Sequence, residues 1–216
     1  DVILPDGTTR QYSLCGDPRD ATSYRIAVRR EPGGAASAVI HDRLAVGDRI
    51  RWGGPRNNFR LAPAARYRFL AAGIGITPLL PMTLAADRMG IPWELTYLGR
   101  RRPSMAFLAD FEPNADRVRV RESSVDGRLD LARWLDETPR DAAVYACGPS
   151  ALLDELSHLS SGAPTRRVRM ERFRATAASS ARATPFTVLI AGTAEAVTVP
   201  PDATVADALR AAGHEV

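Results

Sequence analysis

The residue types that best suit chemistry stand in one glycine-rich turn between a strand and a helix. A buried-strand run, Tyr67–Ala72, ends in Gly73 and Gly75, and Thr77 and Pro78 follow at the start of a helical pattern. Thr77 can cap the first turn of that helix, and Pro78 suits its first position, where no N–H is needed. Glycines permit a close backbone approach, and a helix N-terminus offers N–H donors and partial positive charge to a pyrophosphate. The turn predicts a phosphate site, and a ligand-free strand-to-helix turn is the alternative.

A second run with chemical potential lies near the start of the chain, where Arg10, Tyr12 and Ser13 share one extended segment. Alternate side chains of a strand share a face, so Arg10 and Tyr12 point one way and Ser13 the other. An arginine suits a phosphate, and an aromatic ring suits a flat ligand. A half-exposed structural strand is the alternative.

The glycine turn opens a region in which strands and helices alternate. This alternation predicts a parallel sheet with right-handed crossovers and a ligand crevice at the carboxyl ends of its strands. The strand-like runs are Tyr67–Ala72, Glu94–Leu98, Arg117–Arg121, Ala142–Ala146 and Arg167–Met170, and the helical stretches lie near Leu79–Met89, Ser104–Phe111, Asp130–Leu135 and Ser150–Leu159.

The region before the turn carries several short strands separated by turn signals, which predicts a small antiparallel barrel or sandwich. One of these strands is expected at Tyr24–Arg30, and a short helix is expected after Gly33–Ser37. Residues 175–184 are small and polar and predict a linker. The last segment predicts a hairpin and a helix, too short for a full core of its own. We therefore expect a β domain at 1–64, an α/β domain at 65–174, a linker at 175–184 and a partial domain at 185–216.

Composition narrows the functional classes. The chain of 216 residues is 45% apolar and 25% charged, which is ordinary for a globular protein. All 29 basic residues are arginine, and the net charge of +4 is too small and scattered to indicate nucleic acid. The sequence contains neither an apolar run of about 20 residues nor a signal-peptide pattern. Its two cysteines, Cys15 and Cys147, form no metal-ligand spacing, which favours a reduced, cytoplasmic protein.

Five motifs in order resemble the ferredoxin-NADP reductase superfamily, and most closely its phthalate dioxygenase reductase and vanillate demethylase reductase branch. The resemblance covers essentially the whole chain. The motifs are Arg10-x-Tyr12-Ser13, Gly34-x-x-Ser37, Gly73-x-Gly75-x-Thr77-Pro78, Cys147-Gly148-Pro149 and Glu171-Arg172-Phe173.

The resemblance implies a flavin site and a nicotinamide site. Arg10 is expected at the flavin phosphate, Tyr12 against the isoalloxazine and Ser13 near the flavin N5. Gly34 and Ser37 correspond to the loop that holds the phosphate of FMN. The remaining site residues that the resemblance implies are Gly73, Gly75, Thr77 and Pro78 at the nucleotide pyrophosphate, Cys147, Gly148 and Pro149 near the nicotinamide, and Glu171 and Phe173 closing over the flavin, with Phe173 stacked on its ring.

The resemblance also implies where the electrons go. The tail Phe186–Val216 resembles the start of a plant-type [2Fe–2S] ferredoxin domain of the β-grasp type. Such a cluster needs four cysteine thiolates, and none follows Val205, so this chain does not ligate it. The chain also begins after the first expected barrel strands, which indicates a fragment of a longer protein. The expected activity is electron transfer from NAD(P)H through FMN to the cluster and on to an oxygenase of the Rieske or haem type.

Three positions depart from the family pattern. Ala35 and Ala36 stand where the phosphate loop usually has glycines, and Ala72 stands where the nucleotide turn usually begins with one. Added methyl groups would crowd a close backbone approach. Two alternatives therefore remain, a cluster-free NAD(P)H:flavin or quinone reductase and a non-catalytic module with a degraded flavin loop.

The coenzyme is expected to be chosen after the second strand of the α/β domain. An acidic residue there favours NAD, whereas an arginine accommodates the 2′-phosphate of NADP. Arg100 and Arg101 follow that strand, and Ser104 can add a hydroxyl. The run favours NADPH, although the closest branch mostly prefers NADH, and a solvated arginine run is the alternative.

Overall fold

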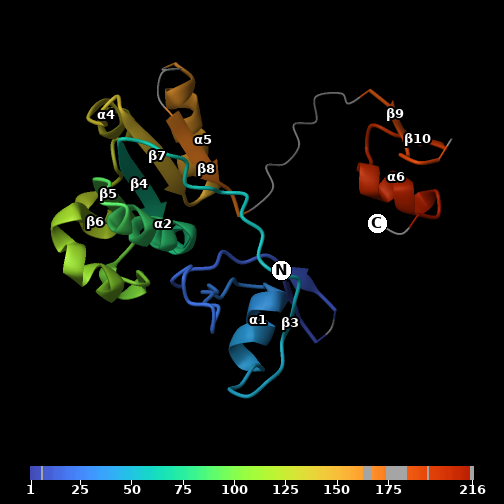
Figure 1. Ribbon diagram of the computed structural model, residues 1–216, viewed down its shortest axis with the longest axis horizontal. Coiled ribbons are helices and arrows are strands. Elements are labelled where there is room, and N and C mark those ends of the chain that lie inside the picture. Colours follow the sequence, from blue (N-terminus) through green and yellow to red (C-terminus); the bar gives the residue numbers. More distant parts are fainter. Residues whose placement is uncertain (6, 163–166, 174–183, 194, 215–216) are drawn as a thin grey trace. The chain divides into compact units, whose positions relative to one another are not determined.

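The computed structural model of the protein describes residues 1–5, 7–162, 167–173, 184–193 and 195–214. The chain divides into two compact units, Asp1–Arg174 and Ala175–Val216 (Figure 1). Most of the predicted linker lies outside the described residues. No helix in the described parts of the chain is long and apolar enough to cross a membrane.

A five-stranded parallel sheet organises the first unit. Its strands run in the order β6-β5-β4-β7-β8, so the chain starts at the centre, moves to one edge and then returns to the other. This order places a topological switch point between β4 and β7, where open parallel sheets bind their ligands. The strands are β4 (Arg66–Ala72), β5 (Trp93–Gly99), β6 (Val118–Glu122), β7 (Ala142–Cys147) and β8 (Arg167–Glu171), which confirms the five predicted strands to within one residue at each end.

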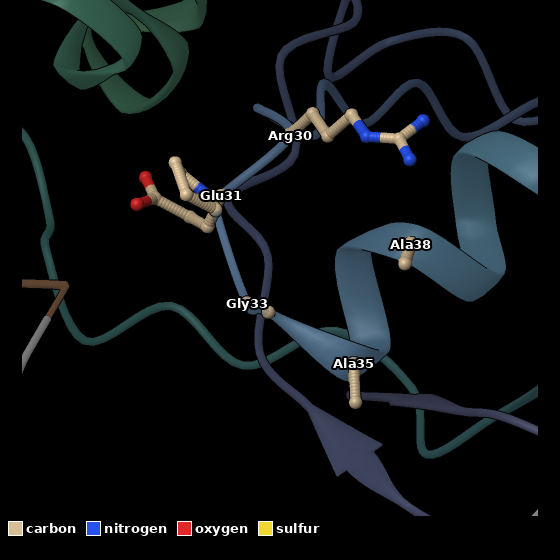
Figure 2. Close-up of a pocket in the computed structure, with 7 residues that line it drawn as sticks. Arg30, Glu31, Gly33, Ala35 and Ala38 are labelled. Carbon is tan, nitrogen blue, oxygen red and sulfur yellow. The ribbon is translucent and has the colours of Figure 1, made fainter.

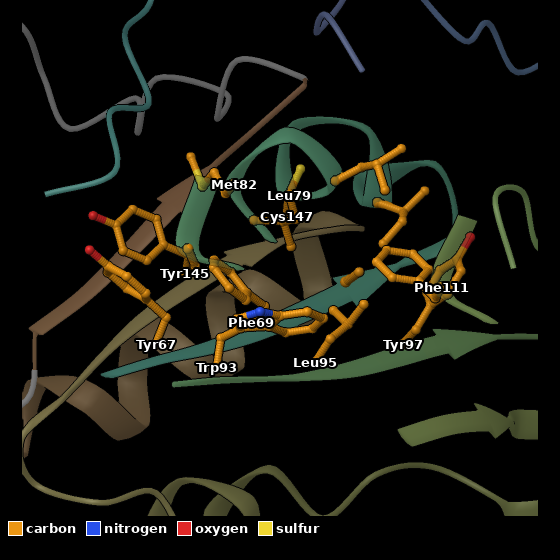
Figure 3. Packing of buried hydrophobic residues seen from close by; sticks show 14 of the residues in the cluster. Tyr67, Phe69, Leu79, Met82, Trp93, Leu95, Tyr97, Phe111, Tyr145 and Cys147 are labelled. Carbon is orange, nitrogen blue, oxygen red and sulfur yellow. The ribbon is translucent and has the colours of Figure 1, made fainter. Parts of the chain in front are cut away.

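Helices cover both faces of this sheet because its buried strands present apolar side chains alternately to each face. Phe69 and Tyr145 pack with residues of α2 (Ile76–Arg88) on one face (Figure 3). Leu70 and Val144, one position along each strand, pack on the opposite face with α4 (Leu131–Asp136) and α5 (Ser150–Ser161).

The segment after β5 differs from the prediction. The helix expected at Ser104–Phe111 is replaced by two 3-10 segments, η2 (Arg102–Ser104) and η3 (Ala109–Arg117), followed by a short α3 (Ser123–Asp126). Phe107 lies between the two 3-10 segments with a φ of 63°, a left-handed conformation that interrupts a right-handed helix.

The antiparallel region before β4 has shorter ladders than expected. Three two-residue strands, β1 (Val2–Ile3), β2 (Thr9–Arg10) and β3 (Arg51–Trp52), form a sheet in the order β2-β1-β3. The strand expected at Tyr24–Arg30 is reduced to one bridge between Leu14 and Ile26. The predicted short helix is present as α1 (Ala35–Asp42), but it starts earlier than expected, inside the Gly33–Ser37 stretch. The fold class, an antiparallel β region followed by a parallel α/β domain, is confirmed.

The second unit is a hairpin with one helix. Strands β9 (Phe186–Leu189) and β10 (Ala196–Val199) pair in antiparallel fashion, and α6 (Val205–Ala211) starts with a capping box between Thr204 and Asp207. Its buried cluster is small and consists of Val197, Val199 and Ala208. These elements agree with the predicted partial β-grasp tail.

Candidate functional site

The glycine turn and the Cys147-Gly148-Pro149 segment lie at the switch point, because they follow β4 and β7. Gly73 adopts a φ of 55°, which glycine tolerates at little cost. A Cβ on Gly75 would lie 2.2 Å from the carbonyl oxygen of Cys147. Glycine is required at position 75 because the two segments pack backbone to backbone.

The start of α2 differs in detail from the prediction. The helix begins at Ile76 with Gly75 as its N-cap, and the Thr77 hydroxyl donates to the Ile74 carbonyl at 3.0 Å. The predicted cap by Thr77 is therefore wrong, and Pro78 is the third helical residue, where a missing N–H still removes no helical bond. With neither a side-chain cap nor an acidic residue in the first turn, this N-terminus suits an anion.

Ser13 and Glu171, which are 158 positions apart, meet beside Cys147. The Ser13 hydroxyl donates to Oε2 of Glu171 at 3.0 Å. Glu171 pairs in register with Cys147 across β8 and β7. The structure thus joins the antiparallel region to the carboxyl end of the parallel sheet through three of the predicted site residues.

Burial raises the pKa of both titratable members of this group, Cys147 and Glu171. Burial raises the pKa of the Cys147 thiol, and the nearby Glu171 carboxyl raises it further. Burial also raises the pKa of Glu171, against the hydrogen bond from Ser13. A thiol with a raised pKa is a poor nucleophile, so the group suits the positioning of a reactive cofactor rather than covalent catalysis.

The N-terminus of α1 borders a pocket of about 530 Å³ (Figure 2). The N-cap of α1 is Gly34, which has no side chain to cap the free N–H groups of the first turn. The Ser37 hydroxyl accepts from the N–H of Glu31 at 3.1 Å and donates to the Gly34 carbonyl at 3.0 Å, so it holds the loop in shape. Ala35 lines the pocket, whereas Ala36 is buried. An uncapped helix start with an open pocket fits the phosphate of FMN, and only one of the two alanine methyl groups faces it.

The other predicted flavin residues, Arg10, Tyr12 and Phe173, do not hydrogen-bond to the Ser13 group among the described contacts. Arg10 is exposed and donates to the Thr9 carbonyl at 2.9 Å, and Tyr12 is half-buried. Phe173 is 46% exposed. Among the described contacts, none of the three hydrogen-bonds to another predicted site residue.

The predicted coenzyme-selecting edge contains a carboxylate that the sequence analysis missed. Arg100 and Arg101 are exposed, and the Ser104 hydroxyl donates to the Arg101 carbonyl at 2.8 Å. Glu122 pairs with Gly99 across β6 and β5, and its Oε2 accepts from the N–H of Arg102 at 2.8 Å. Glu122 is far from Arg101 in the sequence, so only the strand register reveals it.

A second missed residue is Asp154 on α5. Its Oδ1 lies 2.7 Å from the Arg172 guanidinium, without hydrogen-bond geometry. Arg172 stands between Glu171 and Phe173, so this ion pair anchors the segment that carries both. Asp154 is one of several carboxylates on the chain's helices, and nothing in the sequence marks it as the partner of Arg172.

A glycine turn at the switch point of a parallel sheet, an uncapped helix start in the antiparallel region and the hydrogen bond between Ser13 and Glu171 fit a reductase that binds a flavin and a nicotinamide coenzyme. No family model matches the chain. The beta subunit of phenoxybenzoate dioxygenase from Ectopseudomonas oleovorans is 38% identical over 100% of this chain and 68% of that protein.

Solved structures agree with this class. An intact type IV self-sufficient cytochrome P-450 monooxygenase matches with a TM-score of 0.85 and 41% identity over 94% of this chain and 27% of that chain. Phthalate dioxygenase reductase, described as modular for electron transfer from pyridine nucleotides to [2Fe–2S], matches with a TM-score of 0.77 and 31% identity over 100% of this chain and 69% of that chain. The chain belongs to the phthalate dioxygenase reductase and vanillate demethylase reductase branch of the ferredoxin-NADP reductase superfamily. It is an NAD(P)H-dependent oxidoreductase of the oxygenase-reductase kind.

Proposed function

We propose that the protein transfers electrons from NAD(P)H through FMN to a [2Fe–2S] centre that serves an oxygenase. The observation that carries the proposal is the hydrogen bond from Ser13 to Glu171 beside Cys147. It joins the predicted flavin strand to the carboxyl edge where the nicotinamide is expected.

Bound FMN would accept a hydride from the nicotinamide and release electrons one at a time. The protein supplies position and surroundings. The starts of α1 and α2 hold the two phosphate-bearing groups, with Arg10 adding charge at the first. Tyr12 and Phe173 offer aromatic faces to the flavin ring, and Ser13 offers a hydroxyl to its N5. The neutral Cys147 thiol excludes water from the nicotinamide side without competing as a nucleophile.

The 216 residues of this chain do not supply the ligands of the iron–sulfur centre. The sequence has two cysteines, and Cys15 and Cys147 are both buried in the first unit. Two buried thiols cannot replace the four thiolates that the cluster needs. The chain is similar to a subunit of phenoxybenzoate dioxygenase and to part of a self-sufficient monooxygenase. Both matches support an oxygenase, either separate or fused, as the final electron acceptor.

Two further points belong to the proposal. The four ranges 1–64, 65–174, 175–184 and 185–216 serve as flavin domain, nucleotide domain, linker and ferredoxin-like start. A cytoplasmic location agrees with two unpaired thiols, since the cytosol keeps cysteines reduced.

The test is anaerobic flavin reduction in the full chain reconstituted with FMN. The wild type should turn yellow with FMN and bleach when NADH or NADPH is added. Ser13→Ala should slow bleaching by about tenfold, because one hydrogen bond to the reacting flavin is lost. Ser160→Ala is the matched control, since the hydrogen bond of its hydroxyl in the described part of the chain goes to the Ser157 carbonyl within α5.

A protein that stays colourless with FMN would contradict the proposal and favour a non-catalytic module. Rapid bleaching followed by electron transfer to quinones but never to an iron–sulfur protein would favour the cluster-free reductase. Normal bleaching in Ser13→Ala would remove Ser13 from the site.

A further inference from the structure

Tyr97 places a hydroxyl group in the buried core of the first unit. It lies on β5, is fully buried and sits beside Phe111 in the cluster that faces α2 (Figure 3). Its hydroxyl lies 3.2 Å from the Gly73 carbonyl oxygen and 3.1 Å from the Ala106 carbonyl oxygen. Burial raises its pKa to about 12, so the hydroxyl keeps its proton and donates. One proton is therefore shared between two backbone carbonyls.

The first acceptor belongs to the turn after β4. A trans peptide unit is planar, so the Gly73 carbonyl and the Ile74 N–H lie in one plane and point in opposite directions. Holding the carbonyl toward Tyr97 therefore turns the Ile74 N–H away from the core. Gly73 has no Cβ and a φ of 55°, so its own conformational preference restrains this plane weakly. The Gly73 carbonyl also accepts from the Ile76 N–H, and the tyrosine hydroxyl adds a second restraint from β5.

The second acceptor belongs to the loop after β5. Ala106 precedes Phe107, whose φ of 63° is positive, as in no other described non-glycine residue. Such a conformation persists only where its surroundings hold it. The Arg25 guanidinium lies 4.5 Å from the centre of the Phe107 ring and pairs with Asp110 at 3.1 Å. The loop is thus held by Arg25 on one side and by Tyr97 on the other.

We propose that Tyr97 is a positioning residue for the coenzyme: its hydroxyl fixes the Gly73 peptide plane against the Ala106–Phe107 loop and thereby aims the Ile74 N–H at the pyrophosphate. This inference rests on the proposed function, because it takes the glycine turn as the pyrophosphate site. It adds a determinant that lies beneath the turn and touches no ligand.

The test compares Tyr97→Phe with Tyr67→Phe in the full chain with FMN. Tyr67 is an equally suitable buried tyrosine, 2% exposed, whose hydroxyl donates to the Ala62 carbonyl at 3.0 Å near the opposite end of β4. The measurements are the melting temperature, the Kd of NADP⁺ and NAD⁺ by calorimetry, the Kd of FMN, and the KM and kcat for coenzyme oxidation.

Both variants should lose thermal stability to a similar extent, since each loses one buried hydrogen bond. Only Tyr97→Phe should raise the coenzyme Kd and KM, by roughly fivefold to tenfold, with kcat and the FMN Kd changed by less than about twofold. A purely structural role would lower both melting temperatures and leave the coenzyme Kd of Tyr97→Phe unchanged, which overturns the proposal while the proposed function stands. An equal rise of the coenzyme Kd in Tyr67→Phe would also overturn it. A wild type that binds neither coenzyme would overturn both.

Discussion

Gly75 and Cys147 pack backbone against backbone: a Cβ added to Gly75 would lie 2.2 Å from the Cys147 carbonyl oxygen and 2.8 Å from the nitrogen of Gly148. On the other side of the same junction, a Cβ on Gly148 would lie 2.8 Å from the methyl of Ala72. The two ligand-facing segments are thus fixed relative to each other by direct contact. The methyl of Ala72 therefore packs against this junction.

Gly75→Ala should destabilise the protein more than Gly73→Ala. The φ of Gly75 is −63°, which alanine adopts readily, so the cost is steric and should be about 1 to 3 kcal/mol, as for an overpacked core. Gly73 has a φ of 55° and open space around its Cβ position, so its cost is conformational and should be about 1 kcal/mol. Urea unfolding of both variants measures the difference, and coenzyme affinity should fall further in Gly75→Ala. An equal loss of unfolding free energy in the two variants would show that the backbone at Cys147 shifts to accommodate the added methyl group at little cost.

The sequence was sufficient to predict the parallel sheet but not the site's detailed contacts. Buried runs such as Tyr67–Ala72 are continuous and apolar, and turn residues bound them, so the five strands follow from local pattern. The bond between Ser13 and Glu171 depends on how two regions dock. Motif order could imply it only through the family resemblance. Glu122 was missed because strand register is a tertiary property.

The segment after β5 and the antiparallel region show the limits of periodicity. The helical pattern at Ser104–Phe111 is interrupted because Phe107 adopts a left-handed conformation, which is held by Arg25 from a distant part of the chain. Thr77 has the residue type of an N-cap, yet the glycine turn continues directly into α2, and its hydroxyl donates backwards instead. In each case a tertiary contact or a neighbouring turn overrides the local preference.

Stability should depend on pH through Glu171. Burial raises its folded-state pKa above the ordinary 4.5, so the folded protein binds this proton more tightly than the unfolded chain does. The contribution of this proton to folding stability is complete below the ordinary pKa of a glutamate and is lost as the pH rises through the raised pKa of Glu171. Glu171→Gln keeps an acceptor for Ser13 but cannot ionise. The wild type should therefore lose melting temperature relative to this variant as pH increases from about 4.

Glu137 provides a control, because its effect on stability should change with pH in the opposite direction. Its pKa is lowered by the hydrogen bond from Arg133 at 2.8 Å, so its contribution is present above the ordinary value and is lost as pH falls. Glu137→Gln should therefore differ from the wild type mainly at higher pH, where it should be the less stable protein. A flat difference between Glu171→Gln and the wild type across this range would show that the Glu171 carboxyl is solvated.

Phe173→Ala should change flavin access more than stability. Phe173 is 46% exposed, so little buried area is lost on truncation. If its ring covers the flavin, its removal should increase coenzyme affinity and change the rate of flavin reduction. Phe186→Ala in the second unit is a matched control, since that ring is 51% exposed. Stopped-flow reduction of bound FMN measures the effect, and a rate equal to that of the wild type and of the control would exclude Phe173 from the flavin site.

Coenzyme choice should depend on the balance between Arg101 and Glu122 at the carboxyl edge of β5 and β6. Arg101 is exposed, and no ion pair to it is present among the described residues, so its guanidinium is available to a 2′-phosphate. Glu122 would repel that phosphate, but its carboxylate already accepts from the N–H of Arg102 at 2.8 Å. Because the nearby Arg100 adds a second positive charge, we expect NADPH to be accepted and to depend on Arg101.

Arg101→Asp should therefore lower kcat/KM for NADPH by roughly tenfold to a hundredfold, the loss expected for a charge-assisted hydrogen bond replaced by repulsion. The kcat/KM for NADH should not fall, since NADH has no phosphate at that position and an acidic residue there can bind its ribose 2′-OH. Arg128→Asp serves as a control for net charge, because Arg128 is exposed and pairs with Glu155 at 3.4 Å on a different element. Steady-state kinetics with both coenzymes give the two ratios. A wild type with a large preference for NADH that Arg101→Asp leaves unmoved would show that this arginine run is only solvated surface, and that Glu122 or another group sets the preference.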